Sequence, residues 1–367
     1  MGVKKNKMYD IGIISFNINT NLSNYGAALH SYAFQKFLNK IHISSVIIDY
    51  NRSQLKEIIY SAFRHKPIKN LPFILSCIYK RYIFRRFFKK HCIITQKVYN
   101  KTSISEIDCA KRYCCETDVT WSTFKEGFDR AFMCDYPNMK DKNNIAYSID
   151  FGSKKISDNK KVLMKKYSKN FKYISIRNTF RTDEFKSIIE RSDISNTIDS
   201  VFLLNKEDYN PIINIPKNKK DYVFVYNCKE NNKEMVQQAI AFAKKNKLNI
   251  KIVNCCDIQK KQYIYKYPTP VSIEKFLGYI KNAKYIFTNS YHGICFSIIF
   301  ERQFYAFARI GNNHKIKCVL ETFGLINRLM ESGNNFNIDK IDYNKINKIL
   351  KERQKQSQLW LQNALKE

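Results

Sequence analysis

The sequence predicts an α/β protein with two Rossmann-like, doubly wound domains, and three observations support this fold class. The chain has 367 residues, and at about 100 to 200 residues per domain this length favours two domains. Short apolar runs typical of buried parallel strands alternate with segments of helical pattern. The alternation stops in a polar, proline-containing stretch from Asn205 to Lys220 and then starts again. We therefore predict a linker there, between an N-terminal domain of residues 1–205 and a C-terminal domain of residues 206–340.

The N-terminal domain is predicted to begin with a βαβ unit. Its expected elements are a strand at 11–16, a helix at 28–39, strands at 46–50 and 145–149, a helix at 158–170 and a strand at 173–176. Asp49, near the end of the second strand, resembles the acidic residue that ends a nucleotide-binding half-fold. The loop after the first strand contains no GxGxxG, so a dinucleotide site is not predicted.

The C-terminal domain repeats the alternation of strand and helix. Its expected elements are a strand at 222–226, a helix at 234–244, a strand at 250–254, a helix at 272–282, strands at 285–288 and 304–308, and a helix at 317–323. Residues 341–367 are predicted to form two terminal helices, at 343–353 and 357–365, that pack back across the junction between the domains.

The chain is strongly basic. It has 64 Lys and Arg residues against 32 Asp and Glu, a formal net charge of +32. A charge of this size makes contact with a polyanion or an anionic membrane a serious possibility. No recognition-helix, zinc-finger or RNP-like pattern accompanies it, so we predict no specific nucleic-acid partner.

Residues 54–101 are predicted to form a basic helical insertion. From Arg64 to Lys101 there are eleven Lys or Arg residues and no Asp or Glu, interleaved with aromatic and aliphatic side chains. Two interpretations fit this pattern: a basic amphipathic helix that lies on an anionic bilayer surface, or a solvated helical face in a lysine-rich chain. The apolar run at 71–79 is far shorter than the ~20 residues that a membrane-spanning helix needs.

Cysteine and histidine usage indicates a reduced, metal-free protein. The eleven cysteines are odd in number and follow no secretory signal, so we expect a cytoplasmic location. Two adjacent pairs, Cys114–Cys115 and Cys255–Cys256, lack the spacing of a redox or metal motif and are predicted to be small hydrophobic residues in strands. The six histidines are scattered without metal-ligand spacing, so no protein-built metal site is predicted.

The segment Thr288–Ser297 carries the strongest functional signal. It places His292 between an apolar strand and an apolar helix over 294–300, with Gly293 in the turn. In open α/β sheets, crevices at the carboxyl ends of strands bind ligands, and helix N-termini there present N–H groups to anions. Histidine adds a proton donor near neutral pH. The segment predicts either an anion site with a catalytic histidine or a polar residue that caps the end of a strand.

Several short motifs occur in a fixed order along the chain. They are Asn24–Leu29 followed by Tyr32–Leu38, then Ala146–Gly152, Ser175–Arg177, Asp199–Leu204 and Thr288–Ser297. In this order they resemble the polysaccharide pyruvyltransferase family over nearly the whole chain. A further family motif is matched in part by Glu116–Trp121, which keeps Asp118 and Trp121. The resemblance implies a two-domain fold of the glycosyltransferase-B type.

The resemblance also implies a reaction. Members of this family transfer pyruvate from phosphoenolpyruvate (PEP) to two hydroxyls of a sugar, which releases phosphate and leaves a cyclic ketal. The implied acceptor is a surface polysaccharide or its lipid-linked precursor, PEP is a co-substrate, and no cofactor is implied. His292 is the implied general acid and phosphate contact. Because such precursors are commonly assembled on lipid carriers at the cytoplasmic membrane face, the basic insertion predicts a peripheral membrane location.

The remaining implied site residues divide between the two substrates. Arg177 at a strand end is expected to hold a phosphate or carboxylate through its planar guanidinium, unless it is an ordinary surface arginine. The alternative role of Gly26 is a tight turn at positive φ, and the alternative role of Asp118 is a helix cap. The residues assigned to PEP are Arg177, Ser290, Tyr291, Gly293 and Lys315. Those assigned to the acceptor, or to closing the cleft, are Asn24, Tyr25, Gly26 and Asp118.

Two other functions fit the same features. One is a nucleotide-sugar glycosyltransferase of the same two-domain architecture, because fold alone does not fix function. The other is a catalytically inactive protein that has kept the scaffold and binds a membrane surface or polyanion through its basic charge.

Overall fold

The computed structural model describes most of the chain. It covers residues 8–16, 24–51, 67–122, 128–152, 156–177, 179–215, 220–229, 232–256, 271–309, 313–330, 336 and 339–366. Only the backbone is described for residues 67–74, 76, 77, 229, 255 and 256. Residues 54–66 of the predicted insertion and 216–219 of the predicted linker lie outside the described residues.

The first sheet has six strands in the order β2-β1-β3-β4-β5-β6, and its paired strands are parallel. Helices α1 (Tyr25–Lys40), α4 (Asp158–Ser168) and α5 (Thr182–Ile189) follow three of its strands. The strands are β1 (Tyr9–Ile14), β2 (Ser45–Ile47), β3 (Ala110–Asp118), β4 (Asn144–Ile149), β5 (Phe171–Ile176) and β6 (Ser195–Asn196). β3 was not among the strands predicted from the sequence. The Cys114–Cys115 pair, which was expected in a strand, lies buried within it.

The second sheet has five strands in the order β11-β10-β9-β7-β8, again with parallel pairing. The strands are β7 (Tyr222–Lys229), β8 (Asn249–Cys256), β9 (Tyr285–Thr288), β10 (Gln303–Phe307) and β11 (Leu329–Met330). The helices that accompany them are α6 (Lys233–Lys245), α7 (Ile273–Asn282), α8 (Tyr291–Ile299) and α9 (His314–Thr322).

Both sheets share one topological feature. The first strand of each sheet lies between the second and the third, so the direction of winding reverses beside β1 in one domain and beside β7 in the other. Ligands in open α/β sheets bind outside the carboxyl ends of the strands at such a switch point. Helix α1 follows β1 and α8 follows β9, so both helices begin at these positions.

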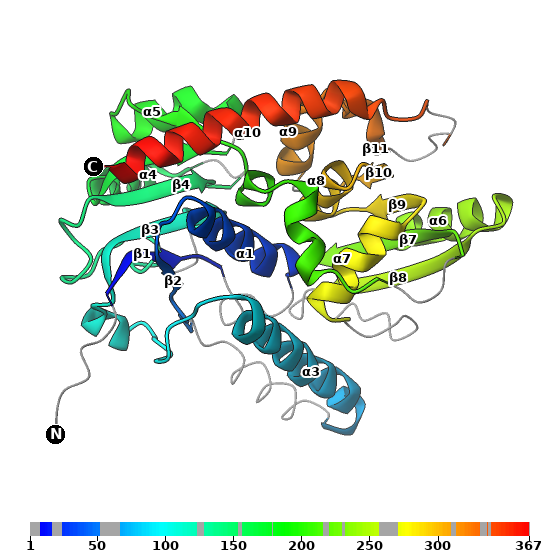
Figure 1. Cartoon of the computed structure of the whole chain (residues 1–367), viewed down its shortest axis with the longest axis horizontal. Coiled ribbons are helices and arrows are strands. Elements are labelled where there is room, and N and C mark those ends of the chain that lie inside the picture. Colours follow the sequence, from blue (N-terminus) through cyan, green and yellow to red (C-terminus); the bar gives the residue numbers. More distant parts are fainter. Residues whose placement is uncertain are drawn as a thin grey trace.

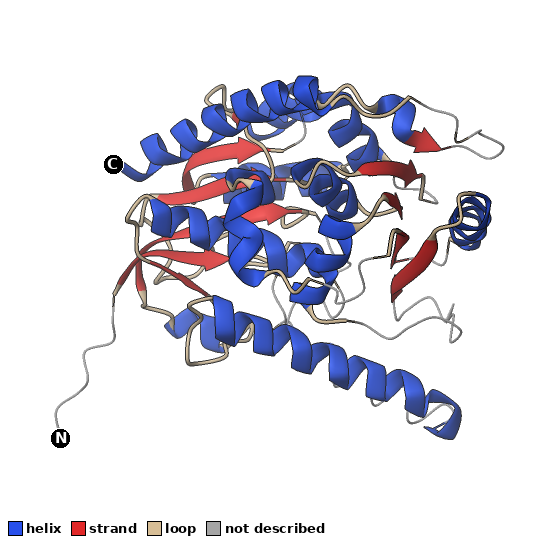
Figure 2. Ribbon diagram, turned by 45° about the vertical axis from the view of Figure 1, so that its right-hand side comes forward, coloured by secondary structure: helices blue, strands red, loops and turns tan. Residues whose placement is uncertain are grey.

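Buried side chains form three hydrophobic clusters, which correspond to the layers seen in Figures 1 and 2. The largest joins the two domains, because it includes Ile11 and Tyr147 of the first sheet and Phe224 and Ile286 of the second. The other two clusters cover the opposite face of each sheet, beneath α4 and α5 in one domain and α6 in the other. Helices therefore pack on both faces of each sheet, and the prediction of two Rossmann-like, doubly wound domains is confirmed.

The basic segment forms one long helix, α3 (Pro67–His91), which runs along the lower side of the molecule in Figure 2. Its C-terminal half is packed against both domains: Phe84 and Phe87 are buried against Tyr25 and Tyr32 of α1, and His91 Nε2 lies 3.2 Å from Glu274 Oε1 of α7. The helix therefore has one buried face. Among the described helices, none is long and apolar enough to cross a membrane.

The C-terminal segment differs from its prediction. The two helices expected at 343–353 and 357–365 are one continuous helix, α10 (Tyr343–Lys366), which runs across the top of Figure 1 from the second domain to the first. Ser357, near the expected break, helps to hold this helix in place. Ser357 is buried and its Oγ accepts a hydrogen bond of 3.0 Å from the Ile198 N–H.

The predicted linker is also more ordered than its composition suggests. A 3-10 segment, η4 (Lys206–Ile212), occupies its first part, and an Asn205–Asp208 capping box begins it. Tyr209 within this segment is completely buried, packs edge-on against Phe296 of α8 and donates a 2.7 Å hydrogen bond to the Val201 carbonyl. The connection between the domains is therefore part of the core.

Tyr25 joins the two domains through its hydroxyl and its ring. The O–H donates to the Val271 carbonyl at 2.8 Å and accepts from the Val271 N–H at 3.0 Å, while the ring stacks on Phe276 with centroids 4.2 Å apart. We expect Tyr25→Phe to lower the free energy of unfolding by about 1 to 3 kcal/mol, because it leaves the partly buried N–H and carbonyl of Val271 without this partner. Urea-induced unfolding followed by circular dichroism measures this change.

Tyr32 provides the matched control for this prediction. It is a buried tyrosine on the same helix, and no hydrogen bond of its hydroxyl is found within the described part of the chain. Tyr32→Phe should therefore change the free energy of unfolding by less than about 0.5 kcal/mol. Equal losses in the two variants would contradict the role given to the Tyr25 hydroxyl.

Candidate active site between the two domains

The candidate site lies where the carboxyl ends of β3, β4 and β5 meet the start of α8. The backbone at these strand ends is unusual, since Thr117, Asp118 and Ser148 have φ values of 26°, 60° and 51°. Non-glycine residues with positive φ are costly and cluster at functional sites, where the surrounding structure holds them. The strain here is concentrated on the strands that carry the polar side chains of the site.

Arg177 is the centre of a buried ion-pair cluster. It directly follows β5 and is only 8% exposed. Its Nη1 lies 2.6 Å from Asp199 Oδ2, and its Nη2 lies 3.0 Å from Asp150 Oδ2 and 3.5 Å from Asp118 Oδ1. Lys315 Nζ of α9 reaches the same Asp118 oxygen at 2.9 Å. The cluster therefore connects four segments of the first domain, which carry Asp118, Asp150, Arg177 and Asp199, to a helix of the second.

The three carboxylates of this cluster stay charged at neutral pH. Burial by itself would raise the pKa of Asp118, but the charges of Lys315, Arg177 and His292 hold that pKa well below its usual value. The pKa of Asp150 is lowered in the same way by Lys315 and Arg177, against the effect of burial. The charges of His292 and Arg177 lower the pKa of Asp199. A proton for chemistry must therefore come from a cationic group and not from these acids.

Arg177 was predicted to hold a substrate anion with its guanidinium. In the structure its two terminal nitrogens bind protein carboxylates, and the guanidinium carbon lies 4.4 Å from the centre of the Tyr291 ring. Stacking on an aromatic face suits an arginine, whose planar cation is attracted to the ring. The alternative of an ordinary surface arginine is wrong, because Arg177 is buried among acids.

His292 lies in the first turn of α8 and not in the turn before it, because the helix begins at Tyr291 and not at Gly293. Ser290 is the N-cap residue, and its Oγ accepts a hydrogen bond of 3.4 Å from the Gly293 N–H. His292 is only 4% exposed, and its Nε2 lies 3.6 Å from Asp199 Oδ2. Within the described residues this nitrogen has no hydrogen-bond partner.

Gly26 and Gly293 are required by close packing. A Cβ on Gly26 would lie 2.0 Å from Nδ1 of His292, and a Cβ on Gly293 would lie 2.4 Å from Oγ1 of Thr288. Neither glycine has positive φ, so the tight turn considered for Gly26 is wrong; it lies in the first turn of α1. Gly26 therefore lets α1 of one domain touch the histidine of the other.

The acceptor residues predicted from the first βα loop are engaged within the protein. Asn24 is the N-cap of α1 and its Oδ1 accepts from the Gly26 N–H at 2.9 Å, while Tyr25 and Gly26 are buried against the second domain. Of the two roles considered for these residues, the structure favours closing the cleft over contacting an acceptor. Asp118 is the last residue of β3 and pairs with Arg177 and Lys315, so the helix-cap alternative is wrong.

A second buried pair lies beside His292 and was missed by the sequence analysis. His30 Nδ1 of α1 lies 2.8 Å from Glu116 Oε2 of β3, both side chains are fully buried, and the His30 and His292 ring centres are 5.8 Å apart. Burial lowers the pKa of His30, but the charge of Glu116 and its hydrogen bond outweigh this and raise it overall. A sequence signal did exist: His30 is four residues after Gly26 and so lies on the same face of α1.

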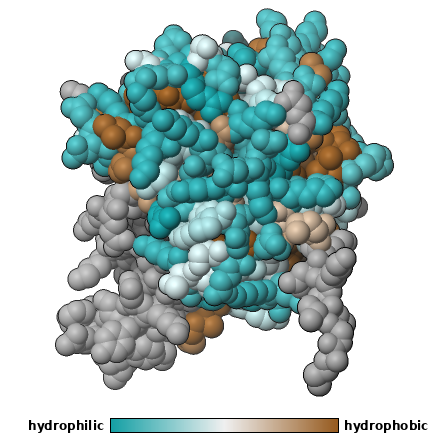
Figure 3. All heavy atoms as spheres, turned by 90° about the vertical axis from the view of Figure 1, so that its left-hand side faces the viewer, coloured by the Kyte–Doolittle hydropathy of each residue, from teal (hydrophilic) through white to brown (hydrophobic). Residues whose placement is uncertain are grey.

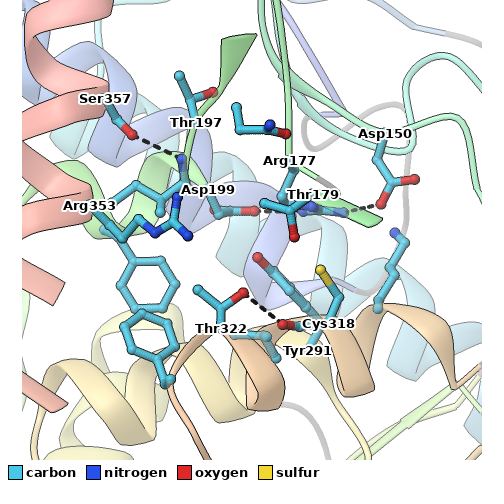
Figure 4. Close-up of a pocket in the computed structure, with 16 residues that line it drawn as sticks. Asp150, Arg177, Thr179, Thr197, Asp199, Tyr291, Cys318, Thr322, Arg353 and Ser357 are labelled. Atoms are coloured by element: carbon cyan, nitrogen blue, oxygen red, sulfur yellow. Dashed lines mark hydrogen bonds and ion pairs between the residues drawn. The ribbon is translucent and has the colours of Figure 1, made fainter. Parts of the chain in front are cut away.

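A pocket opens next to this cluster, between the strand ends of the first domain and α8, α9 and α10 (Figure 4). It encloses about 570 Å³, including the part open to solvent. Arg177, Tyr291 and Lys315, which the sequence analysis assigned to PEP, are among its lining residues, whereas Ser290, Gly293 and His292 are not. His292 itself is buried and lies behind the residues that line the pocket.

Among the described residues, no group of three or more His, Cys, Asp or Glu side chains is arranged to hold a metal ion.

The fold and the site together define a class of protein. Two parallel α/β domains meet at a buried histidine, with an arginine and several carboxylates at strand ends. Ligand sites of α/β proteins lie preferentially at such strand ends and domain interfaces. The chain belongs to the polysaccharide pyruvyl transferase family, whose sequence model matches residues 24–311. The resemblance stated from the motifs is therefore confirmed, and the protein is a transferase of the family that acts on polysaccharides.

Three solved structures are similar to this chain at low sequence identity. The T4 phage BGT in complex with UDP and Mn²⁺ is 10% identical, with 97% of this chain and 99% of that chain covered and a TM-score of 0.41. The wall teichoic acid polymerase TagF is 10% identical, with 99% and 84% covered and a TM-score of 0.41. The E. coli heptosyltransferase WaaC is 10% identical, with 93% and 99% covered and a TM-score of 0.33. Similarity at this level says nothing about substrate, and no curated protein matches the sequence.

The contact between Gly26 and His292 can be tested by stability. Replacing Gly by Ala within a helix normally raises the free energy of unfolding by about 0.5 to 1 kcal/mol. Here the added methyl would overlap the imidazole, so we expect Gly26→Ala to lower the free energy of unfolding by about 1 to 3 kcal/mol. In a His292→Ala background the methyl has room, and the same substitution should cost little. Urea unfolding of all four proteins gives the coupling energy, which we expect to exceed about 1 kcal/mol; an equal cost in both backgrounds would disprove the contact.

Proposed function

We propose that this protein transfers the enolpyruvyl carbons of PEP to two hydroxyls of a sugar, forming a cyclic pyruvate ketal and releasing phosphate. The observation that carries the proposal is His292, a buried histidine at the N-terminus of α8, beside the Asp199 carboxylate and in the domain cleft of a pyruvyl transferase family member. The proposal also uses the Arg177 cluster and the pocket beside it.

The reaction needs one proton donor and two nucleophilic hydroxyls. Protonation of the PEP methylene carbon leaves positive charge on the neighbouring carbon, which the first sugar hydroxyl attacks. Phosphate then leaves with the electrons of its C–O bond, and the second hydroxyl attacks the same carbon. One proton is taken up by carbon, the two hydroxyls each release one, and phosphate accepts one of them. The balanced products are the ketal and inorganic phosphate.

His292 is the proposed donor to the methylene carbon. The Asp199 Oδ2 atom lies 3.6 Å from its Nε2, so the carboxylate and the imidazole interact electrostatically. Burial in a site with little water strengthens this interaction. Arg177 Nη1 forms a 2.6 Å ion pair with Oδ2 of Asp199. The Asp199 carboxylate is therefore held between the arginine and the histidine. Ser290 caps the first turn of α8 by accepting from the Gly293 N–H, and the positive end of a helix suits a phosphate.

The PEP anions would be held at the mouth of the cluster. Lys315 and Arg177 line the pocket, and Lys315 is the more exposed of the two, with 19% of its side chain accessible. Both are paired with carboxylates in the closed structure, so binding of a trianionic substrate has to replace one of these pairs. No part of this scheme requires a cofactor.

We further propose that the acceptor is reached at a membrane surface through α3. The exposed part of this helix presents Leu75, Ile78, Tyr79 and Tyr82, each about half exposed. Beside them a surface groove is lined by five cations, Arg81, Arg85, Arg86, Lys89 and Lys90. By contrast, the face in Figure 3 is mostly hydrophilic with separate apolar patches. Apolar and basic side chains mixed on one exposed helix suit the interface of an anionic bilayer, where a lipid-linked sugar precursor would be available.

The reaction is tested by phosphate release from PEP across a panel of simple and lipid-linked pyranosides, with mass spectrometry for the ketal. His292→Gln keeps the volume of the side chain but removes the acid, so we expect turnover to fall by at least about 100-fold. His42→Asn is the control, since Asn tolerates the positive φ of that position. Normal turnover by His292→Gln would disprove the role of His292. Thermal stabilisation of the wild type by UDP but not by PEP would favour the glycosyltransferase alternative.

The membrane proposal is tested by sedimentation with vesicles of phosphatidylglycerol and phosphatidylcholine. Arg86, Lys89 and Lys90 are exposed on α3, and at about 1 kcal/mol per charge their joint replacement by Gln should weaken binding to anionic vesicles about 100-fold. The control replaces Lys233, Lys244 and Lys245, exposed on α6, and removes the same charge. Equal loss in both triple variants would show that only net charge matters, and would contradict a role for α3.

A further inference from the structure

The end of the pocket away from Lys315 has its own chemistry. Here η3 (Ser200–Leu203), α9 and α10 meet, and Phe202 and Phe323 lie with ring centres 5.4 Å apart. Val319 and Ile198 extend this apolar wall, and Thr322 adds a hydroxyl. Sugars combine apolar C–H faces with hydroxyl groups, so a wall of aromatic rings with a few polar groups suits a sugar ring.

Arg353 reaches into this end of the pocket from α10 (Figure 4). Three cations line the pocket, and two of them, Arg177 and Lys315, form ion pairs with carboxylates. For Arg353, in contrast, no carboxylate partner is found in the parts of the chain that the structure describes. Its side chain is half-buried. A half-buried guanidinium without a protein anion is a ready site for a ligand anion, because charge-assisted bonds to a planar fork are strong.

Hydrogen bonds hold α10 in the position that presents Arg353. Ser357, one turn further along the same face, accepts from the Ile198 N–H at 3.0 Å. Gln354 and Gln358 donate to the Phe202 and Leu203 carbonyls at 3.0 and 2.9 Å. The backbone that carries Arg353 is thus fixed to the same η3 segment that supplies Asp199 and Phe202. The Arg353 guanidinium and the ion-pair cluster of Arg177 therefore lie at opposite ends of the same pocket.

We infer that this end of the pocket is the acceptor subsite, and that Arg353 selects a sugar unit that carries an anionic group. The inference rests on the proposed function, because it assigns the other half of the pocket to PEP. The anion can be the carboxylate of a uronic acid or the phosphate of a glycosyl phosphate. Both present oxygens to Arg353 while the sugar ring packs on Phe202 and Phe323.

Equilibrium binding tests this subsite independently of turnover. Isothermal titration calorimetry with methyl glucoside, methyl glucuronide and glucose 1-phosphate compares a neutral sugar with the two anionic sources. We expect the wild type to bind at least one anionic sugar about ten-fold or more tighter than the neutral one. Arg353→Gln should remove this preference and Arg353→Lys should keep part of it. The control, Lys351→Gln, changes an exposed cation of the same helix and should bind like the wild type.

Each other result has a definite meaning. If the wild type shows no preference for either anionic sugar, or if Arg353→Gln keeps it, the subsite is wrong. If Arg353→Gln instead weakens PEP binding and leaves sugar selectivity intact, Arg353 belongs to the PEP half and the assignment is also overturned. If the wild type binds anionic sugars but releases no phosphate from PEP, the proposed function is contradicted and the subsite is not. Circular dichroism of each variant verifies that α10 stays folded.

Discussion

The ion pairs of Arg177 are the interaction on which the rest of this structure depends. One guanidinium joins acids from the end of β3, the end of β4 and the start of η3, and Asp118 extends the cluster to Lys315 of the second domain. Removing one partner from a buried cluster leaves uncompensated charge, which is far more costly than losing a surface ion pair. The cluster therefore fixes the strained strand ends and also Asp199, which lies beside His292.

The second constraint is the closed contact between the domains. Tyr25 and Gly26 at the start of α1 meet Val271 and His292 of the other domain, and Gly26 leaves no room for a larger side chain. This arrangement keeps His292 out of water. The residues that close the contact between the domains therefore also cover His292.

Sequence patterns predicted the class of fold and most strands, because buried parallel strands are short apolar runs that local composition reveals. They missed β3, which has Lys111 and Arg112 directly after its first residue, Ala110. They predicted two helices where α10 is continuous. Ser357, in the middle of α10, is buried and accepts a hydrogen bond from the Ile198 N–H, 159 positions away. The need for glycine at Gly26 was predicted but not its cause, and the His30–Glu116 pair joins residues 86 positions apart. These contacts depend on tertiary structure, and the only local signal is the four-residue spacing that places Gly26 and His30 on one face of α1.

The central claim is that PEP binds where its negative charge meets His292. Nitrogen-15 NMR of the histidine rings during titration with PEP tests this directly, with His292→Gln to assign the signal. The account predicts that both ring nitrogens of His292 become protonated as PEP saturates the protein, while the exposed histidines do not respond. Saturation with PEP without any change at His292 would contradict it.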